Sequence, residues 1–277
     1  MLSGTSCPFC SRLFSSKANG SYFECITCDV LVSGEAPAPY DQEYYYLKRN
    51  VRSKEAKARA NLLWRHFGRY ISQGKCLDLG CNDGSFVALA TEKGADCEGT
   101  DLSEAALNIA RACGGGVFRS SSELGDTRFE CITAFDVVEH IDLLHEFFEF
   151  VNHRLARNGV LIITTPNKNS KWHWIFRSGW HGLGIPQYHR FVYSKQFLGV
   201  EMERNEFAVE ELFTISPLAK NGWKLLVASG YRLRRNRFYK MGALPMALAA
   251  FAAGKVLIGG EEDTICIVAR KKTAVDG

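Results

Sequence analysis

The chain has 277 residues, of which 46% are hydrophobic and 23% are charged, and its net charge at pH 7 is +4. These values exclude a disordered chain and allow one large domain with a small additional one. Residues 1–6 do not resemble a secretory leader, and no apolar run is long enough to span a bilayer. The ten cysteines are therefore expected to be thiols or metal ligands in a cytoplasmic protein.

Residues 1–33 are predicted to form a separate unit that binds a metal ion. Cys7 and Cys10 form one Cys-x-x-Cys pair, and Cys25 and Cys28 form a second pair after 14 intervening residues. Four thiolates complete a closed tetrahedral site for Zn²⁺, which indicates a structural rather than a catalytic role. A redox pair or a chance spacing is the alternative. The pattern resembles a zinc ribbon, in which the metal supplies much of the folding free energy.

Residues 34–47, with two prolines and three consecutive tyrosines, are predicted to be a linker. Residues 54–71 then have the apolar spacing of a helix with a basic opposite side. Nine Lys or Arg residues and one acid lie between Lys48 and Lys75, and a second basic cluster lies at 232–240. Each cluster is consistent with a solvated surface, and together they favour a phosphate-bearing partner such as a nucleotide-linked substrate, RNA or an anionic membrane.

The remaining chain alternates between strand and helix patterns, as in a doubly wound sheet. The predicted strands are 75–80, 96–101, 115–119, 130–136, 159–165, 223–229 and 264–270, and the predicted helices are 85–93, 103–113, 143–155 and 210–220. This order predicts an α/β fold with a Rossmann-like, seven-stranded sheet whose last two strands are antiparallel at an edge. It forms a domain over 48–277, after the small zinc ribbon.

The first strand of this sheet leads into a loop that is typical of ligand binding. Asp78, Gly80, Asn82 and Gly84 alternate along it, and Asp101 ends the next strand, 17 residues after Gly84. This is close to the spacing at which a nucleotide-binding unit offers a carboxylate to ribose hydroxyls. The loop lacks the glycines of a dinucleotide fingerprint and the lysine of a P-loop. It therefore suits a nucleoside without a pyrophosphate, with an ordinary strand–turn–helix as the alternative.

Four blocks in order, 78–84, 99–103, 135–141 and 158–167, resemble class I S-adenosylmethionine-dependent methyltransferases over roughly residues 50–272. The last two blocks are similar to quinone-pathway O-methyltransferases and sugar-modifying methyltransferases, some of which carry an N-terminal zinc ribbon. The chain departs from the family pattern in two places. Asn82 stands where a glycine is usual, and Ser120 to Glu123 offers no aspartate for the adenine amino group.

The resemblance implies roles for the residues of these blocks in binding S-adenosyl-L-methionine. Asp78, Gly80, Asn82 and Gly84 belong to the first motif, whose glycines let the backbone approach the methionine portion. Asp101 would accept the ribose hydroxyls, and Leu102 would cover one face of the adenine. Asp136 or Val137 would lie beneath the sulfonium.

His140 is the predicted general base, because it follows the fourth strand and a histidine can titrate near neutral pH. A structural histidine is the alternative, and Glu139 is expected to position the loop. An insertion at about 168–215 is unusually aromatic and is predicted to be a lid or acceptor site. Tyr188, His189 and Arg190 are the predicted substrate contacts there, and an aromatic minicore is the alternative.

These observations predict methyl transfer from S-adenosylmethionine to a small polar metabolite, such as a sugar or nucleotide-linked sugar. An RNA methyltransferase, a lipid or quinone methyltransferase and a non-catalytic cofactor-binding scaffold are the alternatives. The apolar segment 241–260 is expected to pack as a buried edge helix, or to rest on a membrane.

Overall fold

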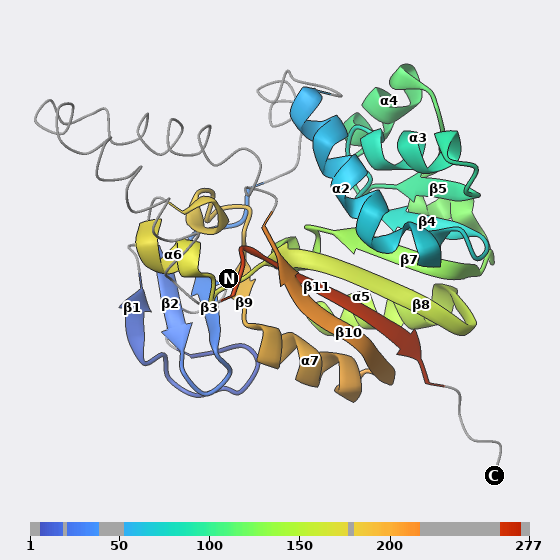
Figure 1. Cartoon of the computed structure of the whole chain (residues 1–277). Helices are drawn as coiled ribbons and strands as arrows, with labels where there is room; N and C mark the ends of the chain where they lie inside the picture. The colour runs from blue at the N-terminus through green and yellow to red at the C-terminus, as the bar shows by residue number, and fades with distance from the viewer. Residues whose placement is uncertain (1–5, 19–20, 39–52, 177–179, 217–260, 273–277) are drawn as a thin grey trace, which may run out of the picture. The chain divides into compact units, whose positions relative to one another are not determined.

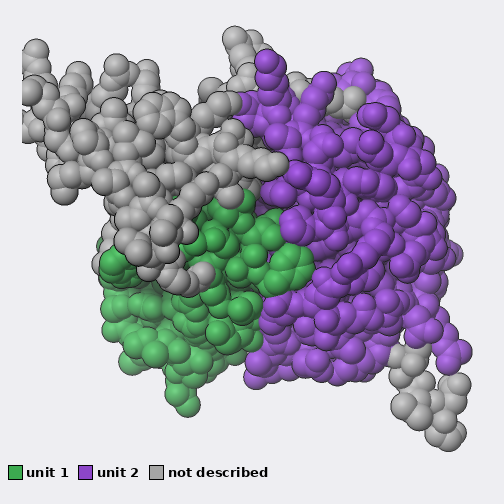
Figure 2. Space-filling model, in the orientation of Figure 1, with its two compact units in different colours: residues 1–36, 166–197, 213–265 green, residues 37–165, 198–212, 266–277 purple. Residues whose placement is uncertain are grey.

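The structure is a computed structural model that describes residues 6–18, 21–38, 53–176, 180–216 and 261–272. The chain divides into two compact units, which Figure 2 shows in different colours. Unit 1 comprises residues 1–36, 166–197 and 213–265, and unit 2 comprises residues 37–165, 198–212 and 266–277. Part of the expected insertion therefore groups with the N-terminal segment.

The predicted seven-stranded sheet is confirmed, and most of it belongs to unit 2 (Figure 1). Its order is β10-β11-β8-β7-β4-β5-β6. The strands are β4 (Cys76–Leu79), β5 (Cys97–Thr100), β6 (Val117–Phe118), β7 (Phe129–Phe135), β8 (Leu155–Pro166), β10 (Phe207–Ile215) and β11 (Thr264–Lys271). Strands β8, β7, β4, β5 and β6 are parallel to one another, so the loops that follow their carboxyl ends share one edge.

The helices of this sheet lie where the apolar periodicity predicts them. They are α2 (Lys54–Ile71), α3 (Ser85–Glu92), α4 (Glu104–Cys113) and α5 (Leu144–Arg154). The side chain of Ser103 caps α4 by accepting a hydrogen bond from the backbone N–H of Ala106 (3.4 Å), as expected for this residue type. Phe67 of α2 and Phe86 of α3 both pack on Phe135 of β7. Helices α2 and α3 therefore cover the same face of the sheet.

The prediction of a helix at 210–220 is wrong, because this segment contains the end of strand β10. The backbone N–H of Lys272, just past β11, donates to the carbonyl of Glu206, just before β10, so these edge strands are antiparallel. Phe213, Thr214 and Ile215 suit a strand, and pairing with β11 overrides the helix-like spacing of the segment. The predicted strand at 223–229, the basic cluster at 232–240 and the apolar segment 241–260 lie outside the described residues.

Helix α7 (Lys195–Arg204) precedes β10 and was not predicted. It begins after Ser194, whose side chain accepts a hydrogen bond from the backbone N–H of Phe197 (3.2 Å). This serine is the local signal that could have indicated the start of the helix.

Unit 1 contains a four-stranded sheet in the order β1-β2-β3-β9. Strands β1 (Ser16–Ala18), β2 (Tyr22–Cys25) and β3 (Val30–Ser33) form an antiparallel meander. Strand β9 (Phe191–Tyr193) comes from the expected insertion and pairs with β3. Helix α6 (Lys171–Phe176) also belongs to this unit. A small core holds the unit together; it consists of Tyr22, Leu31, Trp172, Trp180, Leu183 and Val192.

Candidate functional site

The loop between β4 and α3 turns sharply where the sequence motif places its alternating residues. Gly80, Asn82 and Gly84 have positive φ angles of 72°, 51° and 70°. The backbone N–H groups of Gly80 and Cys81 donate to the carbonyl of Thr100 at the end of β5 (2.8 and 3.0 Å). A Cβ atom on Gly84 would lie 2.4 Å from the ring of Phe118, so only glycine fits there. The loop is thus fixed by backbone geometry and by its neighbouring strand.

Asp101 connects this loop to the end of β5. One oxygen of its carboxylate accepts the backbone N–H of Asn82 (3.1 Å), and the other accepts the backbone N–H of Ser103 (2.9 Å). Burial raises the pKa of Asp101, while these two hydrogen bonds and nearby His140 lower it. Each carboxylate oxygen has a second lone pair, so Asp101 can still accept two hydroxyl hydrogens. Its role toward ribose hydroxyls stays a prediction.

Asn82 departs from the family pattern without disturbing the turn. Asparagine tolerates the left-handed region better than most residues, and the backbone of Asn82 already makes the hydrogen bond to Asp101. The substitution therefore leaves the contact between loop and carboxylate in place.

Asp78 lies beneath the loop in the middle of β4, and its side chain is buried. It accepts a hydrogen bond from the hydroxyl of Thr133 on β7 (2.6 Å). Burial raises the pKa of Asp78 to about 7; the Asp101 carboxylate raises it as well, whereas Thr133 and Arg59 lower it. Asp78 can consequently exchange a proton near neutral pH, and its charge depends on which groups lie above it.

The end of β7 brings Asp136 and Val137 to the same edge of the sheet. A Cβ atom on Gly80 would lie 2.7 Å from a methyl carbon of Val137, so these two segments are in close contact. The carboxylate of Asp136 pairs with Arg59 of α2 and accepts the hydroxyl of Thr164 (3.1 Å). The sequence places Arg59 on the basic side of the predicted helix, and no local pattern indicates that it pairs with Asp136.

His140 and Glu139 follow in the short 3₁₀ helix η2 (Val138–His140). The Nε2 atom of His140 is 4.0 Å from a carboxylate oxygen of Glu139. Glu139 is buried, and its other oxygen accepts the hydroxyl of Thr165 (2.9 Å). The pair thus places a partly exposed imidazole beside an anchored carboxylate, which is an arrangement suited to general-base chemistry.

Several features of this edge fit a nucleoside cofactor. The hydroxyl oxygens of Ser85 and Thr100 are buried and have no hydrogen-bond partner among the described residues. Leu102 follows Asp101 directly, and its side chain is 97% exposed. The glycine loop is hydrogen-bonded to Asp101 and leads directly into the first turn of α3, at the carboxyl edge where ligands of such sheets bind.

The predicted substrate contacts lie in unit 1, away in sequence from the cofactor loop. His189 and Arg190 are buried, and each is held within that unit: the Nδ1 atom of His189 is 2.8 Å from the carbonyl of Gly182, and Arg190 donates to the carbonyl of Glu35 (2.6 Å). The core around Trp180 matches the aromatic minicore that was the alternative. An acceptor role for Tyr188, His189 and Arg190 stays a prediction.

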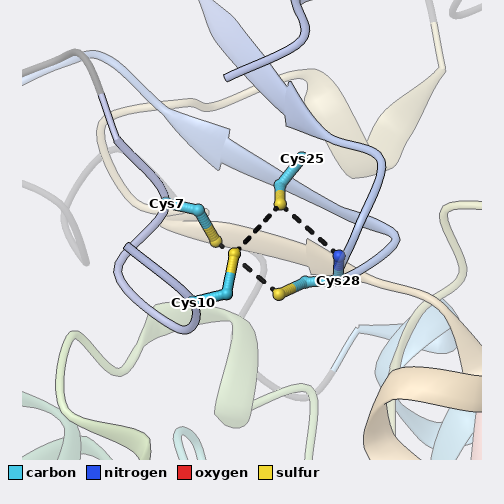
Figure 3. Close-up of side chains that lie close together, drawn as sticks. All are labelled: Cys7, Cys10, Cys25 and Cys28. Atoms are coloured by element: carbon cyan, nitrogen blue, oxygen red, sulfur yellow. Dashed lines mark hydrogen bonds between the residues drawn. The ribbon is translucent and has the colours of Figure 1, made fainter. Parts of the chain in front are cut away.

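The four cysteines of the N-terminal segment converge as their spacing predicts (Figure 3). The sulfurs of Cys7 and Cys28 are 3.9 Å apart, and those of Cys10 and Cys25 are 3.6 Å apart. A tetrahedral zinc ion with Zn–S bonds of about 2.3 Å would require sulfurs about 3.8 Å apart. The backbone N–H of Cys28 donates to the sulfur of Cys25 (3.4 Å), an interaction that favours a thiolate. The cluster therefore fits a four-coordinate ion.

A methyltransferase domain family matches residues 48–212, more than half of the chain. A ubiquinone biosynthesis O-methyltransferase from Azorhizobium caulinodans is 28% identical over 188 residues, which cover 60% of this chain and 74% of the relative. A structure of a SAM-dependent methyltransferase from Archaeoglobus fulgidus has a TM-score of 0.53 at 18% identity, covering 82% of this chain and 99% of its own. Geranyl diphosphate C-methyltransferase from Streptomyces coelicolor has a TM-score of 0.51 at 17% identity, covering 77% of each chain.

The chain belongs to the methyltransferase domain family, and it is an S-adenosylmethionine-dependent enzyme. The resemblance inferred from the four sequence blocks is thereby confirmed. No helix in the described part of the chain combines the length and apolar character needed to cross a membrane.

Proposed function

We propose that the enzyme transfers a methyl group from S-adenosylmethionine to a hydroxyl of a small molecule, and specifically to a ring hydroxyl of a quinone precursor. The observation that carries the acceptor class is the name of the curated relatives, which are ubiquinone biosynthesis O-methyltransferases. This evidence favours the quinone alternative over the sugar or nucleotide-linked sugar expected from the sequence.

In this proposal the edge of the seven-stranded sheet binds the cofactor. The backbone of Gly80, Asn82 and Gly84 faces the methionine portion, Asp101 accepts the ribose hydroxyls, and Leu102 covers the adenine. Asp78 adds negative charge beneath the loop, and Asp136 and Val137 lie toward the sulfonium. The cofactor supplies a methyl group on an already activated carbon, so the protein mainly aligns the reactants.

A hydroxyl acceptor must lose its proton during transfer, and His140 is the side chain proposed to accept it. Glu139 is fixed by Thr165 and lies beside the imidazole, where its negative charge stabilises the imidazolium that forms. His140 is a catalytic residue in this scheme, whereas Glu139 and Thr165 are positioning residues.

The cysteine cluster is proposed to bind a structural Zn²⁺ ion. Four thiolates at these sulfur distances close the coordination sphere and leave no position for a substrate. The ion would contribute folding free energy to unit 1 and take no part in methyl transfer.

An RNA acceptor is the second candidate, and the structure offers it less support than the basic helix suggested. Three of the basic residues between 48 and 75 are paired with acids: Arg59 with Asp136, Arg69 with Glu211 and Lys75 with Glu98. Positive charge that is already neutralised contributes little to phosphate binding. Family membership likewise gives no support to a non-catalytic scaffold.

The proposal is tested by labelled methyl transfer from S-adenosylmethionine to three acceptors: an isoprenylated catechol, a nucleotide-linked sugar and total RNA. Label in the catechol alone is the expected result. Label in the sugar or RNA alone would overturn the acceptor class while leaving the enzyme class intact. S-adenosylhomocysteine binding, measured by calorimetry in the same preparation, verifies that the protein is competent.

A further inference from the structure

We propose that the metal ion held by the four cysteines organises the segment that carries Tyr188, His189 and Arg190, so that metal binding controls recognition of the acceptor. This inference rests on the proposed function, because these three residues are the predicted acceptor contacts. The cysteines themselves would never touch the acceptor. Their influence would pass through contacts that lie entirely within unit 1.

The first link is a continuous sheet. Strand β3 begins at Val30, two residues after the ligand Cys28, and pairs with β9 in the register Val30↔Tyr193, Leu31↔Val192 and Val32↔Phe191. Strand β9 begins one residue after Arg190. A change in the position of the second cysteine pair would therefore be transmitted directly to the backbone beside the predicted acceptor residues.

The second link is a set of hydrogen bonds between the end of β3 and residues 186–190. The backbone N–H of Ser33 donates to the carbonyl of Arg190 (2.8 Å), and its buried hydroxyl donates to the carbonyl of Pro186 (2.7 Å). The guanidinium of Arg190 in turn donates to the carbonyl of Glu35 (2.6 Å). Both the backbone and the side chain of Arg190 are thus held by the N-terminal segment.

Tyr22 makes an equivalent contact from β2. Its side chain is 1% exposed, and its hydroxyl donates to the carbonyl of His189 (3.1 Å). Tyr22 is three residues before the ligand Cys25 on the same strand. Strand β2, which carries Cys25, and strand β3, which begins two residues after Cys28, therefore each have a direct hydrogen bond to the segment.

The third link is the side chain between the first two ligands. Phe9 lies between Cys7 and Cys10, and its ring packs on Phe191 of β9 (centroids 5.1 Å apart) and on Phe197 of α7 (4.8 Å). The loop of the first cysteine pair thus places an aromatic ring on β9, and the loop of the second pair is followed directly by β3. Metal coordination is the connection that fixes the two pairs to each other.

The described strands of the N-terminal segment are only three or four residues long, too short to be stable alone. Without the metal, the segments of the two cysteine pairs keep weak thiol contacts and two hydrogen bonds that involve side chains, from Arg12 to Thr27 and from Ile26 to Ser15. The register of β3 and the place of Phe9 are then less constrained. Residues 186–193 should then loosen. The cofactor loop belongs to unit 2 and is fixed by its own strands, so it should keep its geometry.

The test uses the full chain with Cys25→Ser and Cys28→Ser combined, and Cys113→Ser, an exposed cysteine outside the cluster, as the matched control. Four quantities are measured: zinc content, S-adenosylhomocysteine affinity, the kinetic constants for the acceptor, and hydrogen exchange of 186–193. We expect zinc to be lost, cofactor affinity to stay within about twofold, and kcat/KM for the acceptor to fall about 10- to 100-fold through misplacement of the contacts. Exchange at 186–193 should rise severalfold.

A second pair of variants keeps all four ligands. Phe9→Ala removes the ring that packs on β9, and Phe14→Ala removes a ring of the same segment that stacks on Phe23 instead. Phe9→Ala should retain zinc and cofactor affinity while raising the KM for the acceptor and the hydrogen exchange of 191–193. Phe14→Ala should change neither this KM nor this exchange. Equal effects of the two variants would overturn the inference.

Unchanged exchange at 186–193 after zinc is lost would also overturn it, as would a parallel loss of cofactor binding. The exchange and metal readouts do not need turnover. If none of the acceptors is methylated by the unmodified enzyme, the proposed acceptor class fails, and the link between metal and segment is still decided.

Discussion

The cofactor edge of unit 2 and the cysteine-bearing part of unit 1 are built by opposite strategies. The hydrogen bond from Asn82 to Asp101 joins residues 19 apart, and that from Thr133 to Asp78 joins residues 55 apart. In unit 1, Tyr22 and His189 are 167 residues apart, and Glu35 and Arg190 are 155 apart. Closing the longer loops costs only about 2 kcal/mol more by length scaling. Loop length alone therefore does not explain why unit 1 carries a metal site.

The difference lies in what each region packs against. The cofactor loop leaves a central strand that is buried between two parallel neighbours, so its geometry is supported by the core of the sheet. The strands between and after the cysteine pairs are short, and β3 pairs with a segment from far along the chain. A metal ion is an efficient way to stabilise so small a region, because coordination contributes free energy without requiring apolar area. The comparison predicts that perturbations of one region leave the other intact.

The largest effect is expected for His140→Gln. Loss of the proposed base should lower kcat for a hydroxyl acceptor by about 10²- to 10⁴-fold, with the KM for S-adenosylmethionine unchanged. His145→Gln, at an exposed position on α5, is the matched control and should retain activity. Steady-state kinetics of both variants measure the effect. A kcat within threefold of the unmodified enzyme would assign His140 a structural role.

Asp101→Asn should weaken the binding of S-adenosylhomocysteine about 10²-fold, because charge-assisted hydrogen bonds to a ribose contribute about 1.5–3 kcal/mol each. Asp96→Asn removes a carboxylate from the exposed turn before β5 and should not change the affinity. Calorimetry gives both dissociation constants. Hydrogen exchange of unit 1 should be the same in both variants, since the cofactor edge is supported independently. Equal affinity of Asp101→Asn and the control would remove Asp101 from the ribose site.

The two regions should also differ in their response to pH. Burial raises the pKa of Asp78 in unit 2 to about 7 and that of Asp263 in unit 1 to about 6. Unfolded aspartate titrates near pH 4, so the folded chain binds more protons above that value, and the free energy of unfolding falls as pH rises. The contribution of Asp78 to the free energy of unfolding should decline up to about pH 7, and that of Asp263 only up to about pH 6.

Urea unfolding between pH 5 and pH 8 tests this difference. Between pH 6 and pH 7, Asp78→Asn should remove a slope of up to about 1.4 kcal/mol per pH unit, whereas Asp263→Asn should have its main effect below pH 6. Asparagine can still accept the hydrogen bonds from Thr133 or from Ser170 and Trp180, so both variants should fold. Identical slopes in the unmodified protein and Asp78→Asn would contradict the assignment.

The smallest effect is expected for Asn82→Gly, which restores the usual glycine of the family motif. The turn is already left-handed and its contact to Asp101 uses the backbone, so stability should change by less than about 0.5 kcal/mol. Asn82→Val is the contrasting variant, because a β-branched residue is strained at this φ angle, and it should destabilise the loop by about 1–2 kcal/mol. Thermal unfolding and cofactor affinity measure both, and equal behaviour of the two variants would show that the turn can rearrange.

The sequence by itself predicted the sharp loop after the first strand of the sheet and the cysteine cluster. Both features rest on local patterns: the glycine spacing, the aspartate at the end of the next strand, and the paired cysteines. Each pattern involves residues close together in sequence, and it sets the backbone conformation of the loop or the spacing of the metal ligands. The alternation of strands and helices indicated the seven-stranded sheet for the same reason. Apolar periodicity reports which side of an element is buried, without reference to its partner.

Only the tertiary structure decided which distant segments meet. Residues 210–215 belong to strand β10 because β11 is available to pair with them, although the spacing over 210–220 predicted a helix. Arg59 pairs with Asp136, and β3 pairs with β9. No periodic pattern in the sequence of either segment indicates these contacts. The burial of His189 and Arg190 follows from the same long-range pairing. Local sequence patterns predict which residues a loop offers for binding or catalysis. Which distant segment a strand or side chain contacts depends on how the whole chain packs, and packing is decided by pairs of residues far apart in sequence.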